Sequence, residues 1–140
     1  MDNLGFQELI VMCIILSIIL GSVIASVFYL LTIGRALKLT QKYHQIAPGL
    51  VWLLLIPIFS LGWNFYILNR TTMGIKGKYA ELGKDCADAG WNIGLAFSIL
   101  ACCSIIFGFI PLVGTLIGLA TFTTWIMYWV KIAGYNRLMV

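Results

Sequence analysis

Charged residues are scarce in this sequence: Asp, Glu, Lys and Arg make up 10% of its 140 residues, against about 25% in an ordinary soluble domain. Hydrophobic residues make up 61%, where a soluble domain has roughly 45–50%. So little charge excludes a disordered, solvated chain. Glycine and cysteine are too few for a collagen-like chain or a disulfide scaffold. The class that remains is an integral membrane protein with a single domain.

Catalytic and metal-binding patterns are missing as well. The one histidine, His44, has no carboxylate near it in sequence, and no cysteine pair has the C-x-x-C spacing of a zinc or redox site. Gly-rich phosphate loops and dinucleotide fingerprints are absent. The net charge of +4 comes from residues beside the apolar runs, so nucleic-acid binding does not follow. The sequence therefore predicts a non-enzymatic protein with no cofactor, no metal and no nucleic-acid partner.

Uncharged runs predict four membrane spans. No charge lies in residues 9–34 or 89–130, and an ionisable group near the bilayer centre costs about 2.5 kcal/mol or more. Because a spanning helix needs about 20 residues, the second run holds two spans, with Pro111 and Gly114 in a tight turn between them. The expected fold is all-α, an integral membrane bundle of four transmembrane helices. The spans are expected at residues 6–33, 49–69, 90–110 and 113–133, with the first helix continuing beyond the membrane and the last two forming a tight hairpin.

The basic residues allow two arrangements of this chain. With four spans and both termini inside, the cytoplasmic side holds six of them, Arg70, Lys76, Lys78, Lys84, Lys131 and Arg137, as the positive-inside rule favours. If residues 49–69 are instead re-entrant, broken at Pro57 and Gly62, all nine lie on the cytoplasmic side and the N-terminus lies outside. Because re-entrant backbone must be shielded from lipid, four spans are preferred. The glycine-containing stretch 70–89 is expected to be an irregular connector.

Small residues at helical spacing lie on three of the expected helices. Such stripes let membrane helices approach closely, either within one chain or between subunits. The first helix, long and uniformly aliphatic, is the favoured contact with a second copy or with a larger membrane complex. The residues of the three stripes are Ser17, Gly21 and Ala25, then Gly90, Gly94 and Ser98, then Gly114 and Gly118.

Several polar residues have two interpretations each. Arg35, Lys38 and Lys42 form one stripe of a continuing helix, which fits contact with anionic lipid headgroups or an ordinary solvated helix end. Thr121 and Thr124 are the candidate lining of a weakly selective pore, although threonine commonly bonds its own helix. Two further features are the pair Asn64 and Asn92, expected to hydrogen-bond each other, and Cys86, the one thiol expected in a loop.

Two stretches, Pro48–Phe65 and Trp125–Ile132, resemble a group of small polytopic membrane proteins of bacteria, some of which carry an N-terminal zinc ribbon. The resemblance covers residues 35–135 and implies the fold and a place in the bacterial cytoplasmic (inner) membrane. The group has no assigned activity, and this chain has no zinc-binding segment at its start. The expected function is that of a non-enzymatic membrane protein forming a homo-oligomer, as a scaffold or a weakly selective pore. The alternative is an accessory subunit of a larger membrane complex.

Overall fold

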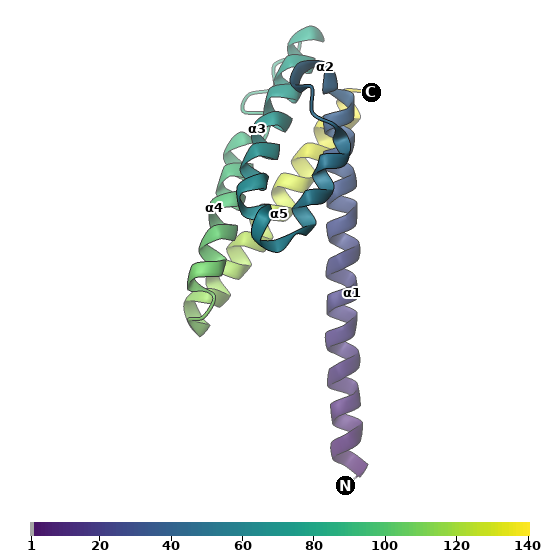
Figure 1. The fold of residues 1–140 in the computed structure, drawn as a ribbon, viewed down its shortest axis with the longest axis vertical. Helices are drawn as coiled ribbons and strands as arrows, with labels where there is room; N and C mark the ends of the chain where they lie inside the picture. The colour runs from purple at the N-terminus through teal and green to yellow at the C-terminus, as the bar shows by residue number, and fades with distance from the viewer. Residues whose placement is uncertain (1) are drawn as a thin grey trace. The chain divides into compact units, whose positions relative to one another are not determined.

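The computed structural model describes residues 2–140, with the side chains of all of these except Asp2 and Leu4. Over these residues the chain is helical and has no strand, which confirms the predicted all-α class. Figure 1 shows the elements along the chain. Their bounds are α1 Asp2–Leu39, α2 Gln41–His44, the 3₁₀ helix η1 Pro48–Leu55, α3 Pro57–Glu81, α4 Trp91–Phe107 and α5 Pro111–Leu138.

Two helices in the described part of the chain are long and apolar enough to cross a membrane, at Gly5–Leu39 and Pro111–Leu138. The helix Trp91–Phe107 is apolar but shorter. The predicted helical class is thus confirmed, whereas two rather than four helices in the described residues are of crossing length. Both long helices carry their charged residues toward their ends.

The chain divides into two compact units, Met1–Leu31 and Thr32–Val140, here termed unit 1 and unit 2. In its described residues unit 1 is a single stretch of α1, and the side chains of residues 5–24 are exposed. Its serines satisfy their hydroxyls on their own helix: Ser17 Oγ donates to Cys13 O at 2.8 Å, and Ser26 Oγ donates to Ser22 O at 2.8 Å. The surface of unit 1 from Leu9 to Ile24 is therefore almost wholly apolar.

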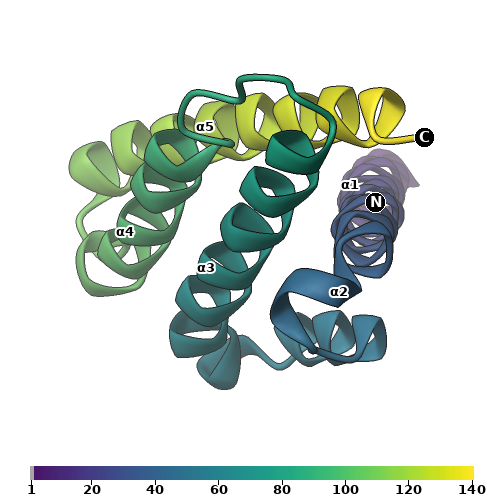
Figure 2. The same cartoon turned by 90° about the horizontal axis from the view of Figure 1, so that it is seen from above.

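Unit 2 has a core of its own. Its first residue, Thr32, is held by α5, because Trp129 Nε1 donates to Thr32 Oγ1 at 2.9 Å and Asn136 Nδ2 donates to Thr32 O at 2.9 Å. Figure 2 shows α3 between α4 on one side and η1 with α2 on the other. The largest fully buried aliphatic side chains come from four different elements: Ile33, Leu37, Val51, Ile75 and Ile132.

The turn between α4 and α5 lies where proline predicts it. Pro111 is at the first turn of α5, where its missing N–H leaves no hydrogen bond unmade. Ile110 N donates to Phe107 O at 3.0 Å, and Gly114 N donates to Ile110 O at 2.7 Å. The turn is tight because a Cβ atom on Gly114 would lie 3.1 Å from Gly108 Cα.

The expected single helix over residues 49–69 is wrong, because the structure places two elements there. η1 ends at Leu55 and α3 begins at Pro57, with Ile56 extended between them at φ −84° and ψ 111°. Pro57 accounts for the break, since proline disfavours helical geometry for the residue before it. Gly62 does not break α3, which continues to Glu81.

The expected irregular connector is also much shorter than residues 70–89, since α3 occupies its first half. Gly74 and Gly77 lie inside α3 at close approaches to other side chains. A Cβ atom on Gly74 would lie 2.9 Å from His44 Cδ2, and one on Gly77 would lie 2.7 Å from Tyr43 Cγ. These glycines make room for α2 rather than flexibility for a loop.

Candidate functional site

Polar contacts between distant parts of unit 2 gather at one end of it, here termed the charged end. It comprises α2, the last turn of α3, the α3–α4 connection and the last turns of α5, which Figure 1 shows together and away from the α4–α5 turn. The contacts join α2 to α3, and the connection to α5. Their members are Lys42, Tyr43, Glu81, Cys86, Asp88, Lys131 and Tyr135.

Asp88 is the most highly connected carboxylate at the charged end. Its Oδ1 accepts Lys131 Nζ at 2.7 Å and Gly90 N at 3.2 Å, and its Oδ2 accepts Asn92 N at 3.2 Å. The ammonium of Lys131, with the two amides, holds the pKa of Asp88 at about 2 despite partial burial. Asp88 therefore satisfies amides at the start of α4 and fastens that start to α5. The sequence analysis placed residue 88 only within an irregular connector; an Asp shortly before an apolar helix was the available signal.

Glu81 joins the end of α3 to α2. Tyr43 Oη donates to Glu81 Oε2, and Lys42 Nζ lies 3.4 Å from Glu81 Oε1. The Tyr43 hydroxyl, followed by the Lys42 ammonium, lowers the pKa of Glu81, and the same carboxylate raises the pKa of Tyr43. An exposed ion pair of this kind contributes little to stability. The ion pair shows that residues 42–43 lie beside residue 81.

His44 is a locked, buried histidine with 5% of its surface exposed. Its Nδ1 accepts Ile46 N at 3.1 Å, so the proton belongs on Nε2, which lies 3.0 Å from Leu37 O and 3.1 Å from Thr40 Oγ1. Burial lowers the pKa of His44, and the charge of Arg70 acts in the same direction against the backbone bond to Leu37. Both ring nitrogens are engaged by the protein, so this residue packs α2 onto the fold.

The stripe of Gly90, Gly94 and Ser98 lies in contacts within unit 2. A Cβ atom on Gly94 would lie 2.8 Å from Tyr128 Cε2, and Ser98 Oγ accepts Asn64 Nδ2 at 2.9 Å. This register corrects the expected Asn64–Asn92 bond, because Asn92 lies nearly two turns along α4 from Ser98. Gly90, at φ +83°, begins α4 in a conformation that glycine adopts without strain.

The remaining predicted residues lie apart from one another. Thr121 Oγ1 donates to Ile117 O at 2.7 Å and pairs with Ser104 Oγ at 3.0 Å, and Thr124 Oγ1 donates to Ala120 O at 2.9 Å. Gly114 is in the α4–α5 turn, while a Cβ atom on Gly118 would meet nothing within 4 Å among the described residues outside its helix. The structure places Ser17, Gly21 and Ala25 on unit 1, and Arg35, Lys38 and Lys42 exposed at the start of unit 2.

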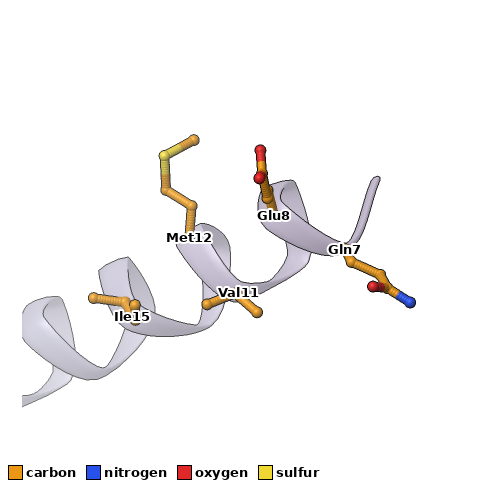
Figure 3. Close-up of a pocket in the computed structure, with 5 residues that line it drawn as sticks. All are labelled: Gln7, Glu8, Val11, Met12 and Ile15. Atoms are coloured by element: carbon orange, nitrogen blue, oxygen red, sulfur yellow. The ribbon is translucent and has the colours of Figure 1, made fainter. Parts of the chain in front are cut away.

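A shallow groove lies on unit 1, between the side chains of Gln7, Glu8, Val11, Met12 and Ile15 (Figure 3). All five belong to one helix, so the groove is the space between successive turns. A single carboxylate beside four side chains without another ionisable group offers no pair of groups for acid–base chemistry.

Residues 2–140 contain no candidate metal site and no activated thiol. No group of three His, Cys, Asp or Glu side chains in this range is placed to hold a metal ion, and the four cysteines are free thiols. Burial raises the pKa of the Cys86 thiol, which opposes formation of the reactive thiolate.

Comparison with known proteins found no family model, curated protein or solved structure that matches this chain. A functional inference therefore rests on three features: the apolar helix of unit 1, the charged end of unit 2 and the contacts between the helices of unit 2. Two of these, the apolar helix and the charged end, differ sharply in the polarity of their side chains.

Proposed function

We propose that this chain is a non-enzymatic protein of the bacterial inner membrane that assembles with copies of itself through unit 1 and serves as a scaffold. The observation that carries the proposal is the surface of unit 1. Residues 9–24 expose an apolar helix whose serine hydroxyls are already bonded within the helix. Because lipid tails are as apolar as leucine side chains, apolar burial alone does not drive two such helices together in a membrane. Association of unit 1 with another helix therefore depends on close packing at its small residues Ser17, Gly21 and Ala25.

Crossing of the membrane is supported by helix length. α5 has 28 residues, so it extends about 42 Å at 1.5 Å per residue. The hydrocarbon core is about 30 Å thick, which leaves its polar last turns, with Lys131 and Arg137, to emerge on one side. The uncharged run of residues 9–34 is long enough to cross in the same way.

A weakly selective pore has less support than a scaffold. Thr121 and Thr124, the candidate lining, bond their hydroxyls to carbonyls of α5. Hydroxyls satisfied in this way have little capacity left to replace the water around an ion. The neighbouring residues on the same face of α5, Gly114 and Ile117, carry no polar side chain.

The alternative is an accessory subunit of a larger membrane complex. Unit 1 forms a compact unit separate from unit 2, so the same small-residue stripe fits a foreign helix as well as a second copy. The two assemblies differ in composition, and a measurement of subunit masses separates them.

The experiment is a substitution on the stripe with a control on the other side of the helix. Gly21→Leu places a large side chain among the small residues, whereas Val23→Leu changes a side chain about 200° around the helix. We expect Gly21→Leu to reduce the gently extracted particle to a single copy, with insertion into the membrane intact and Val23→Leu unchanged. A particle of unaltered size in Gly21→Leu would contradict assembly through this face.

A further inference from the structure

We infer that residues 48–69 form a half-membrane hairpin, which enters one leaflet from the charged end, contacts its acyl chains and returns to the same side. The partner surface is a single leaflet with anionic headgroups. The inference rests on the proposed membrane location, and it changes the number of crossings from four to three, by α1, α4 and α5.

Contacts on either side of the hairpin place both of its ends together. Lys42 precedes it and Glu81 follows it, yet Lys42 Nζ lies 3.4 Å from Glu81 Oε1. Deeper in the fold, a Cβ atom on Gly74 would lie 2.7 Å from Thr40 Cβ and 2.9 Å from His44 Cδ2. A crossing segment would separate residues 40–44 from residues 74–81 by the bilayer, about 30 Å of hydrocarbon. The packed contact excludes that separation.

Neither apolar limb is long enough to cross the hydrocarbon core. η1 has eight residues, which extend about 16 Å at 2.0 Å per residue. The apolar part of α3, from Pro57 to Asn69, extends about 20 Å. Figure 1 shows η1 leading away from the charged end and α3 leading back to it, with the corner short of the α4–α5 turn. Each limb therefore reaches about half to two thirds of the way through the hydrocarbon.

The corner of the hairpin is exposed and apolar. Ile58 is 88% exposed, and the neighbouring side chains are aliphatic or aromatic. Contiguous apolar surface of this kind is unfavourable in water and favourable among acyl chains. The other exposed apolar residues around the corner are Trp52, Leu55, Ile56 and Phe59.

The irregular backbone at the corner is largely satisfied from within, as lipid requires. Ile56 N donates to Leu53 O at 3.2 Å, and Ser60 N donates to Ile56 O at 2.8 Å. Trp63 Nε1 donates to Leu50 O at 3.0 Å and so ties the two limbs together. Pro57 has no N–H to satisfy. The backbone N–H groups of Ile56 and Ser60 at the corner are thus bonded within the hairpin, which reduces the cost of placing irregular backbone in lipid.

Charge complements this placement. All nine basic residues follow residue 34, on either side of the hairpin or after α5 has crossed. With the hairpin in one leaflet, all nine lie on one side of the membrane; with a crossing, Arg35, Lys38 and Lys42 lie opposite the other six. The first arrangement satisfies the positive-inside rule completely and sets the basic residues against anionic headgroups.

The test uses single cysteines in a background with Cys13, Cys86, Cys102 and Cys103 changed to Ala. The reporters are Gln41→Cys before the hairpin and Lys84→Cys after it, both at exposed residues, with Asn3→Cys at the other end of α1. An impermeant maleimide is applied to intact cells and to permeabilised cells. We expect the reporters at 41 and 84 to be labelled from the same side and the reporter at 3 from the opposite side. Labelling of 41 and 84 from opposite sides would overturn the hairpin.

The reporter at residue 3 separates this inference from the proposed function. Labelling of all three reporters from one side would mean that α1 does not cross, which would overturn the membrane assembly proposed for unit 1. The shared side of residues 41 and 84 would still support the return of the hairpin.

A second measurement tests contact with acyl chains. A spin label at Ile58→Cys is compared with one at Gln41→Cys in vesicles of phosphatidylcholine and phosphatidylglycerol. We expect the label at 58 to be relaxed by oxygen and protected from a water-soluble nickel complex, and the label at 41 to show the reverse. Equal access of the nickel complex to both labels would overturn insertion of the corner.

Discussion

Asp88 accepts the ammonium of Lys131 at 2.7 Å, and with its two oxygens it also accepts the amides of Gly90 and Asn92. One carboxylate thus accepts hydrogen bonds from amides at the start of α4 and pairs with a lysine of α5. Removing it leaves amides unsatisfied and a half-buried ammonium unpaired. We expect Asp88→Ala to lower the melting temperature in detergent micelles, by a loss of about 1–2 kcal/mol.

Asp85→Ala is the control for this substitution, because Asp85 is exposed in the same connection. Its melting temperature should stay close to that of the unaltered chain. Equal melting temperatures for Asp88→Ala and Asp85→Ala would show that the contacts of Asp88 do not stabilise the fold.

The carboxylate of Asp88 also sets an acid limit on stability. Its pKa is about 2 in the folded chain against 3.8 as its ordinary value. Between these values the unfolded chain binds more protons, so the contribution of Asp88 is complete above pH 3.8 and is lost as the pH falls toward 2. Thermal melts from pH 5 to pH 2 should decline less steeply in Asp88→Asn than in the unaltered chain. Parallel curves would contradict this assignment.

His44 gives a second pH dependence at milder acidity. Burial lowers its pKa from 6.5, so the unfolded chain takes up a proton before the folded chain does. Stability is therefore complete above pH 6.5 and decreases as the pH falls below that value, until the folded histidine is also protonated. Melting temperatures between pH 7.5 and pH 5 should fall in the unaltered chain and stay level over this step in His44→Gln. A fall of the same size in His44→Gln would assign the effect to another group.

Two glycines of α3 provide a matched pair. A Cβ atom on Gly74 would lie 2.7 Å from Thr40 Cβ, whereas one on Gly62 would meet nothing within 4 Å outside its helix among the described residues. We expect Gly74→Ala to destabilise the protein by about 1–3 kcal/mol through overpacking. Gly62→Ala should be neutral or stabilising by up to about 1 kcal/mol, because alanine favours helix. The melting temperature should therefore fall in Gly74→Ala and stay level or rise in Gly62→Ala. An unchanged melting temperature in Gly74→Ala would contradict the packing of α2 on α3.

The sequence predicts those structural features that depend only on residues near one another along the chain. Uncharged runs predict helices because charge is costly in lipid, and Pro111 predicts the α4–α5 turn because it removes a donor at a fixed place. The continuation of α1 past residue 33 likewise follows from good helix formers and the stripe of Arg35 and Lys38. These inferences need no knowledge of which segments touch.

Prediction fails where a residue's role depends on its neighbour in space. Gly74 and Gly77 read as loop glycines, but α2 packs against them and makes their small size necessary. Pro57 allows a kink within a span or the start of a new helix, and the contacts of residues 40–44 with residues 74–81 favour a return to the same side. Asn64 similarly finds Ser98 rather than Asn92, because register is a property of the packed pair.

The most direct test of self-assembly through unit 1 is native mass spectrometry of the protein extracted gently from its own membrane. We predict complexes whose masses are multiples of 15.6 kDa, reduced to single copies by Gly21→Leu. Single copies of the unaltered chain would contradict the proposed scaffold, and complexes with foreign subunits in fixed ratio would replace it with an accessory role.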